Sequence, residues 1–157
     1  LQAGCPGQKV QRLCRDSEPN PDSDEKQPSE LSSKRSQLAQ WPCQIKLAPI
    51  NAPCFDGAKL LIAADCTAYA YARMHEEFMK GRITLIGCPK LDSIDYSAKL
   101  EEIINNNDIR SVMVVRMEVP CCGGLELAAT KALRSSGKFI PWQVVTISTD
   151  GSIWDKI

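Results

Sequence analysis

The chain has 157 residues, of which 43% are apolar, and its 19 lysines and arginines balance its 19 aspartates and glutamates. This size and composition predict one compact domain with a single core, and they exclude fibres, repeat arrays and coiled coils. Because the net charge is zero, neither nucleic acid nor an anionic membrane surface is an expected partner. The longest apolar stretch, residues 58–64, is too short to cross a bilayer and the N-terminus has no signal-peptide pattern, so we expect a cytoplasmic protein.

Residues 1–40 differ in composition from the rest of the chain. Between Asp16 and Arg35 nearly every residue is charged, polar or proline, and Leu31 is the one large apolar side chain. Such a segment cannot bury enough apolar area to offset its chain entropy. We therefore expect a flexible polar linker or tail over residues 1–40 and a folded, cysteine-rich domain over residues 41–157.

The folded part has the pattern of alternating strands and helices. Alternation of apolar and polar residues predicts a short half-buried strand at residues 43–47, of uncertain place in the sheet. Apolar runs predict four further strands, at residues 60–64, 83–86, 112–115 and 142–147.

Helical spacing of apolar residues predicts three helices between these strands, at residues 67–80, at residues 93–106 and after Pro120. The last of them has the clearest apolar face, formed by Leu125, Ala128, Ala129, Ala132 and Leu133. Nearly continuous apolar strands that alternate with amphipathic helices indicate an α/β fold. We expect a small parallel sheet of about four strands with helices on both faces, flavodoxin-like or Rossmann-like.

Four of the eight cysteines follow predicted strands. Cys66 follows the first of the four apolar runs, Cys88 follows the second, and the pair Cys121 and Cys122 follows the third. Parallel strands end at the same edge of a sheet, which is where open α/β sheets bind their ligands. With strands roughly 4.8 Å apart, three neighbouring strand ends span about 10 Å. The four thiols are therefore predicted to meet around a metal centre.

Four thiolates suit a [4Fe-4S] cluster, and zinc accepts the same ligands. The spread of the ligands over three loops favours the cluster, as do Gly123 and Gly124, which let the backbone approach a bulky cofactor. Free amides at the start of that helix could also donate hydrogen bonds to cluster sulfides. The competing interpretations are that the four cysteines are small buried hydrophobic residues, or that Cys121 and Cys122 form a strained vicinal disulfide.

The other cysteines and the single histidine give weaker signals. Cys43, in the alternating strand, is expected to be a buried hydrophobic residue, and Cys14 has no assigned role. Cys5 and Cys54 could each be an extra ligand or a bystander. His75 is interpreted as a solvated surface residue rather than a metal ligand. The sequence has no Walker loop, no Gly-x-Gly-x-x-Gly after a strand and no nucleophile elbow.

Three motifs together resemble a family of ferredoxin-linked iron-sulfur proteins from anaerobes: residues 63–66 (AADC), 86–92 (IGCPKLD) and 117–124 (MEVPCCGG). The likeness extends over about residues 41–150. It implies iron-sulfur electron transfer, with a ferredoxin domain or another redox protein as partner. In that family a ferredoxin domain usually precedes this region, joined through a Cys-Pro-Gly segment similar to residues 4–7. That domain is missing here, so we expect a fragment, a processed form or a stand-alone version.

Three functions follow as hypotheses. The first is an electron-transfer module with one cluster on the four cysteines named above. The second is a cluster-dependent redox enzyme in which an incompletely ligated cluster binds substrate at an open iron. The third is a structural zinc or thiol-only domain that binds a protein partner. The sequence does not decide whether the protein is an enzyme.

Overall fold

The computed structural model describes residues 5–13 and 35–157, and its centre is a five-stranded sheet with the strand order β4-β3-β5-β6-β7. The first four of these strands in the chain run parallel to their neighbours, and the last is antiparallel. The strands are β3 (Ala58–Ala64), β4 (Ile83–Gly87), β5 (Ile109–Met117), β6 (Trp142–Ile147) and β7 (Ile153–Lys156). The predicted parallel α/β sheet is confirmed, with one more strand than expected.

The strand order reverses direction next to β3. The chain moves from β3 outward to β4, and then crosses back over β3 to β5 and onward to β6. This reversal leaves the carboxyl ends of β3 and β5 as the switch point at which open α/β sheets bind ligands. Of the seven residues of β3, only Lys59 is exposed, as expected for a strand covered on both faces.

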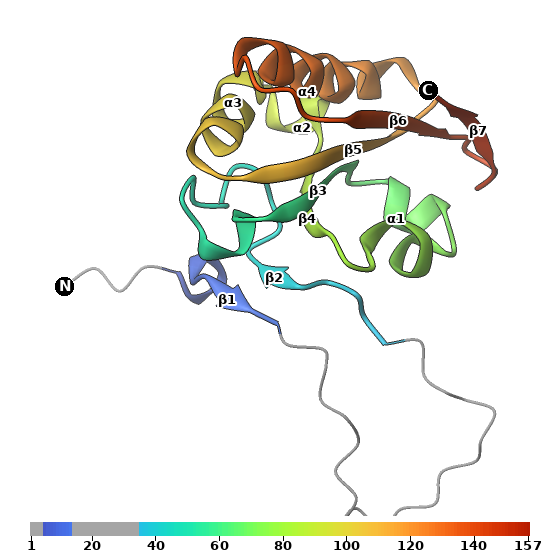
Figure 1. Cartoon of the computed structure of the whole chain (residues 1–157). Helices are drawn as coiled ribbons and strands as arrows, with labels where there is room; N and C mark the ends of the chain where they lie inside the picture. Colours follow the sequence, from blue (N-terminus) through green and yellow to red (C-terminus); the bar gives the residue numbers. More distant parts are fainter. Residues whose placement is uncertain (1–4, 14–34) are drawn as a thin grey trace, which may run out of the picture.

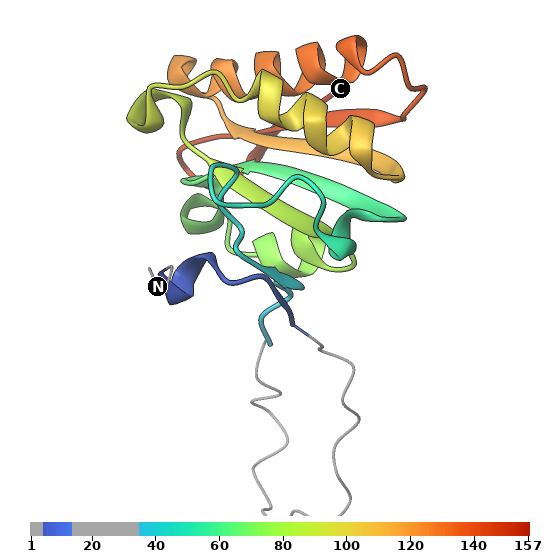
Figure 2. The same cartoon turned by 90° about the vertical axis from the view of Figure 1, so that its left-hand side faces the viewer.

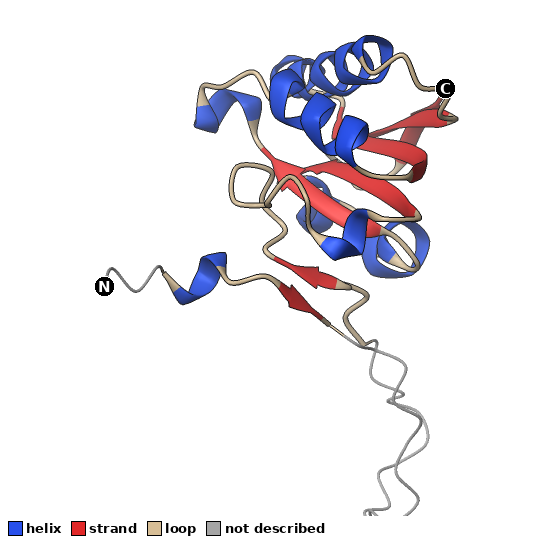
Figure 3. Cartoon of the chain, turned by 60° about the vertical axis from the view of Figure 1, so that its left-hand side comes forward, coloured by secondary structure: helices blue, strands red, loops and turns tan. Residues whose placement is uncertain are grey.

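Helices cover both faces of the sheet, as expected (Figures 1 and 3). The helices α3 and α4 pack against each other on one face, and α1 and the π-helix η3 lie on the other face. Their bounds are α1 (Thr67–Ala70), η3 (Met74–Met79), α2 (Pro89–Asp92), α3 (Ser97–Asn106) and α4 (Gly123–Ser135). Short 3-10 turns occur at η1 (Pro6–Gln8), η2 (Pro53–Phe55) and η4 (Pro120–Cys122).

The prediction of one continuous helix over residues 67–80 is wrong. The chain forms one turn of α-helix, becomes extended at Tyr71 and then forms η3. Tyr71 is buried, its hydroxyl donates a 2.5 Å hydrogen bond to Glu77, and Arg73 forms an ion pair with the same carboxylate at 2.8 Å. These contacts hold the break between the two helical segments. The helix predicted at residues 93–106 begins later in the chain, at Ser97, and the separate short helix α2 precedes it.

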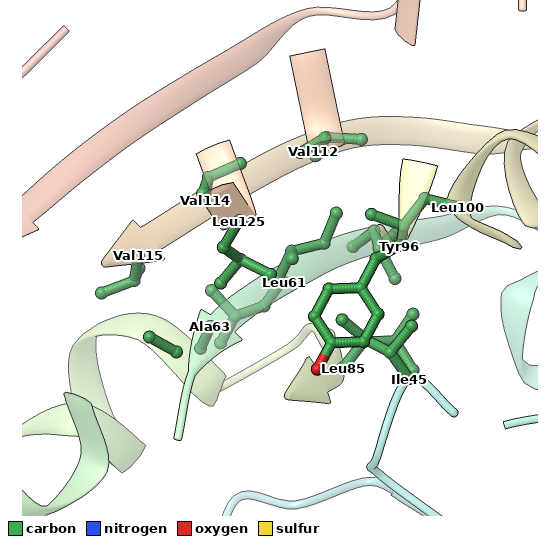
Figure 4. Close-up of a cluster of buried hydrophobic side chains, with 14 of the residues drawn as sticks. Ile45, Leu61, Ala63, Leu85, Tyr96, Leu100, Val112, Val114, Val115 and Leu125 are labelled. Atoms are coloured by element: carbon green, nitrogen blue, oxygen red, sulfur yellow. The ribbon is translucent and has the colours of Figure 1, made fainter. Parts of the chain in front are cut away.

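The main core lies between the sheet and the pair α3 and α4 (Figure 4). Leu125 of α4 and Leu100 of α3 are both fully buried, and Val114 of β5 lies in the same layer. Complete burial of one such aliphatic side chain contributes about 1.5–3 kcal/mol. The apolar face predicted for α4 is confirmed, because all five of its residues are buried.

Two short segments before β3 pack onto the outer side of β4. Strand β1 (Gln11–Arg12) pairs with β2 (Gln40–Trp41), and the Gln40 side chain donates to the Thr84 carbonyl oxygen and accepts from the Thr84 N–H. The folded part therefore includes residues on the N-terminal side of the boundary expected at residue 40. Residues 14–34, including Cys14, lie outside the described residues.

The strand predicted at residues 43–47 is wrong. Only Gln44 forms a β-bridge, parallel to Ile86 at the outer edge of β4, and the chain then turns. Ile45 is buried, but Leu47 is 42% exposed, so the alternation in the sequence reflects a turn with one anchoring side chain. Among residues 5–13 and 35–157, no helix has both the length and the apolar content needed to cross a membrane.

Candidate functional site

Three cysteine-bearing loops lie next to one another at the carboxyl end of the sheet. They follow β4, β3 and β5, which are consecutive in the strand order. The register pairs Ala64 with Gly87 and Ala63 with Val115, so the strands end at nearly the same level. Figure 2 shows α2 and the start of α4 at this carboxyl end of the sheet, on the left of the view. We call the edge formed by Cys66, Cys88, Cys121 and Cys122 the cysteine edge.

The loop after β3 is held by its own hydrogen bonds. The Thr67 side chain is fully buried and its hydroxyl donates a 2.7 Å hydrogen bond to the Ala64 carbonyl oxygen. The Cys66 carbonyl oxygen accepts from the N–H groups of Tyr69 and Ala70, at 3.1 and 3.0 Å. This tight turn directs the chain into α1 and leaves the Cys66 side chain exposed.

The loop after β4 is positioned by a buried tyrosine. Tyr96 is 2% exposed, and its hydroxyl donates to the Asp92 carboxylate and accepts a hydrogen bond from the Cys88 N–H. A Cβ on Gly87 would lie 2.6 Å from the Tyr96 hydroxyl oxygen, so only glycine fits at this strand end. Burial, followed by the Asp92 hydrogen bond, raises the pKa of Tyr96 far above its usual range. The hydroxyl therefore stays protonated and fixes the backbone of Cys88.

The loop after β5 places two cysteines at the start of α4. The Cys122 N–H donates a 3.0 Å hydrogen bond to the Val119 carbonyl oxygen, and Cys122 occupies the position just before the first helical residue. Cys121 is exposed and Cys122 is buried. A half-buried ion pair between Arg116 and Glu126, at 2.7 Å, ties β5 to the first turn of α4.

The pKa of Cys122 is affected by thiols of two of these loops. Burial raises the pKa of Cys122, and the neighbouring thiols of Cys121 and Cys66 raise it further, the first through a hydrogen bond as well as its charge. Cys66 and Cys122 come from loops 56 residues apart in the sequence, and the charge of Cys66 makes the smallest of these contributions to the raised pKa of Cys122. In the conformation described, however, no three His, Cys, Asp or Glu side chains of the described residues are arranged to hold a metal ion.

The loop after β4, which carries Cys88, packs against the start of α4. A Cβ on Gly124 would lie 3.2 Å from the Cβ of Pro89, so the residue after Cys88 packs directly on the first turn of α4. A Cβ on Gly123 would meet nothing within 4 Å, so the glycine pair has open space on one side and a close packing contact on the other. Four thiols match the ligand chemistry of a thiolate-bound iron-sulfur cluster, although the described side chains are not yet arranged to hold a metal ion.

Other predicted candidates lie elsewhere. Cys54 is in η2, which precedes β3, so it lies at the amino end of the sheet, opposite the cysteine edge (Figure 2). Cys5 is exposed in the segment that leads to β1. Cys43 is half-buried beside β4 rather than fully buried, and burial raises its pKa. His75 is exposed in η3, and its Nδ1 accepts a 3.0 Å hydrogen bond from the Gln37 N–H.

One polar residue of this region was not singled out from the sequence. Asp65 precedes Cys66, and its Oδ1 is buried without a hydrogen-bond partner among the described residues. Burial, then the charge of Asp92, raises the pKa of Asp65. An acidic residue directly after an apolar strand was the available signal.

Comparison with known proteins identifies the domain. The family described as a Rossmann-like domain matches residues 52–157, which is more than half of the chain. The chain belongs to the Rossmann-like domain family. An uncharacterized protein of Archaeoglobus fulgidus is 31% identical to this Rossmann-like domain protein over 118 residues, covering 74% of this chain and 83% of the relative. No solved structure matches the Rossmann-like chain.

Proposed function

We propose that this Rossmann-like domain binds a [4Fe-4S] cluster through Cys66, Cys88, Cys121 and Cys122 and acts in electron transfer. The observation that carries the proposal is the adjacency of three cysteine-bearing loops at the switch point of the sheet. The raised pKa of Cys122, to which Cys121 and Cys66 both contribute, supports it, because cubane clusters are held by cysteine thiolates from neighbouring loops.

The surrounding residues suit that role. A cluster held here would supply one-electron transfer, and its charge would face the positive end of the α4 dipole. The Gly123 N–H already donates to the Pro120 carbonyl oxygen, so of the glycine pair it is the Gly124 amide, in the first turn of α4, that we assign as a donor to sulfide. Tyr96 holds the Cys88 backbone in place through its hydroxyl.

We propose a ferredoxin domain or a similar redox protein as the electron partner. Such a partner has to approach the cysteine edge, where Cys66 and Cys121 are exposed. Two large apolar side chains close to this edge in the sequence are exposed. Tyr69, three residues after Cys66, is 94% exposed, and Leu91, three residues after Cys88, is 82% exposed. Exposed apolar side chains around a redox centre are suited to a transient protein contact.

Anaerobic reconstitution of the full chain with iron and sulfide tests the proposal. We expect iron and sulfide to bind in about equal amounts, as in a cubane cluster. Cys66→Ser and Cys122→Ser should each lose most of the bound sulfide, whereas Cys54→Ser, at the opposite end of the sheet, should bind as much as the unmodified protein. Stoichiometric zinc without sulfide, or equal loss in Cys54→Ser and Cys66→Ser, would contradict the proposal.

A further inference from the structure

A pocket of about 380 Å³ lies beside the cysteine edge, on the sheet face that carries α1 and η3. Its lining includes Ala63 of β3 and Ile86 of β4, which are partners in the strand register. Asp65 lines the pocket at the carboxyl end of β3, Thr84 lines it within β4, and His75 of η3 lines it from the helical side. None of the four proposed cluster ligands is among the lining residues.

Two polar atoms of this lining have no partner among the described residues. They are the Thr84 hydroxyl oxygen, on a residue only 1% exposed, and Asp65 Oδ1. Buried polar atoms in folded proteins are nearly always hydrogen-bonded, because an unpaired one loses its hydration without compensation. Both unpaired atoms belong to one pocket, so a bound molecule that pairs with them accounts for both.

The strand register separates the two atoms along the pocket. Thr84 is the register partner of Leu61, and Asp65 lies four residues after Leu61. At roughly 3.3 Å per residue, the two backbone positions are about 13 Å apart. Ala63 and Ile86 lie between them, so the lining is polar at each end and apolar in the middle.

The charge of the lining decides which ligand ends fit. The pocket is lined by one carboxyl group, that of Asp65, and by no lysine or arginine of the described chain. His75 also lines the pocket, and its Nδ1 accepts a hydrogen bond from the Gln37 N–H. A cationic donor suits the Asp65 end, and an uncharged hydroxyl or amine suits the Thr84 end.

We propose that this pocket binds a small elongated amine, with its ammonium group on Asp65 Oδ1, its methylene chain over Ala63 and Ile86, and a second polar group on the Thr84 hydroxyl. The site is additional to the proposed cluster and does not depend on it, since its polar atoms come from other residues. A ligand there adjoins the turn at Cys66, because the lining includes the residues on both sides of that cysteine.

The test is an amide NMR titration of the full chain, kept reduced, with three straight-chain five-carbon probes: aminopentanol, pentylamine and pentanoate. We expect aminopentanol to give saturable shifts at the amides of Ala63, Asp65 and Thr84. Pentylamine, which lacks the second polar group, should bind about tenfold more weakly. Pentanoate should give no saturable shift, because the lining has a carboxyl group and no lysine or arginine to pair with it.

Three variants assign the two ends. Thr84→Val keeps the side-chain shape and should weaken aminopentanol about tenfold while leaving pentylamine unchanged. It should also raise the urea midpoint of the free protein, because the unpaired hydroxyl is gone. Asp65→Asn should weaken both amines by tenfold or more. Thr130→Val removes a hydroxyl that bonds only within α4 and serves as the control with unchanged affinities.

Four results would overturn the proposal: no saturable aminopentanol shifts at these amides, pentanoate binding as tightly as aminopentanol, equal effects of Thr84→Val on both amines, or equal effects of Thr84→Val and Thr130→Val. Because iron and sulfide content is measured separately, a failed reconstitution leaves this result standing, and a failed titration leaves the cluster proposal standing.

Discussion

Tyr96→Phe removes one oxygen atom and tests how the Cys88 loop is held. The hydroxyl donates to Asp92 and accepts from the Cys88 N–H, so two hydrogen bonds are lost. The hydrogen bond from the Cys88 N–H, between uncharged groups, contributes about 1 kcal/mol to the free energy of unfolding. The bond to a carboxylate would contribute more, but the Asp92 side chain is 27% exposed and water can replace the donor, so we assign it about 1 kcal/mol as well.

The expected loss is therefore about 2 kcal/mol in the free energy of unfolding. With a urea dependence of roughly 2 kcal/mol per molar, the midpoint should fall by about 1 M, with the slope unchanged. Tyr69→Phe is the matched control, because Tyr69 is 94% exposed and its substitution should stay within about 0.5 kcal/mol. Equal midpoints for Tyr96→Phe and Tyr69→Phe would refute the role given to the Tyr96 hydroxyl.

The same variant has a pH signature. The pKa of Tyr96 is raised in the folded protein, so its stabilising contribution is complete below the unfolded tyrosine value of about 10 and is lost as the pH rises above it. Stability of the unmodified protein should thus fall above about pH 10, and Tyr96→Phe should show a shallower fall. Some decline should persist in the variant, because burial also raises the pKa of Tyr71. An identical alkaline profile in both proteins would contradict the assignment.

Two further predictions concern the turn between β6 and β7. Glu118 Oε1 accepts a hydrogen bond from the Thr149 N–H at 2.8 Å, so Glu118→Ala should speed hydrogen exchange of that amide. Hydrogen bonds from Thr149 and Ser148 lower the pKa of Glu118, so in the unmodified protein the protection of the Thr149 amide should be lost as the pH falls through that lowered value. Gly151→Ala should cost about 2–3 kcal/mol, because φ is +85° and the new Cβ would lie 2.5 Å from the Ala70 carbonyl oxygen. Gly137→Ala, with φ of +65° and open space, should cost only about 1 kcal/mol by the same urea assay.

The sheet could be predicted because its strands are buried on both faces. Apolar runs in β3 and β6 carry that burial directly, and the order of strands and helices then requires parallel pairing. Strand β7 could not be predicted in this way. It lies at the edge, and Trp154, Asp155 and Lys156 are all exposed, so no apolar pattern marks it.

The segment after Cys66 shows where periodicity stops being informative. Tyr71, Met74 and Phe78 have the spacing of one helical face, and all three are buried. Their spacing of three and four residues nevertheless does not distinguish a continuous α-helix from an α-turn, a break and a π-helix. The contacts of Tyr71 and Arg73 with Glu77, which decide between these geometries, depend on the folded path of the chain.

The cysteine edge followed from one topological rule, whereas the pocket did not follow from any. Strand ends can be located from the sequence, so the residues after them can be placed at a common edge. Thr84 is in the middle of a buried strand, where a threonine is ordinary. Only the register and the unpaired state of its hydroxyl make Thr84 a candidate ligand contact, and both are properties of the folded protein.

The two proposed sites share one strand end, and this has a thermodynamic consequence. Asp65 lines the pocket and the next residue, Cys66, belongs to the cysteine edge, so an amine on Asp65 and a cluster on Cys66 act on the same turn. Binding free energies at coupled sites are reciprocal. If reconstitution with iron and sulfide changes the aminopentanol affinity by some factor, saturating aminopentanol must change the cluster affinity by the same factor. Two independent sites would instead give unchanged amine affinities in the apo and loaded proteins, and Thr84→Val would then alter amine binding alone.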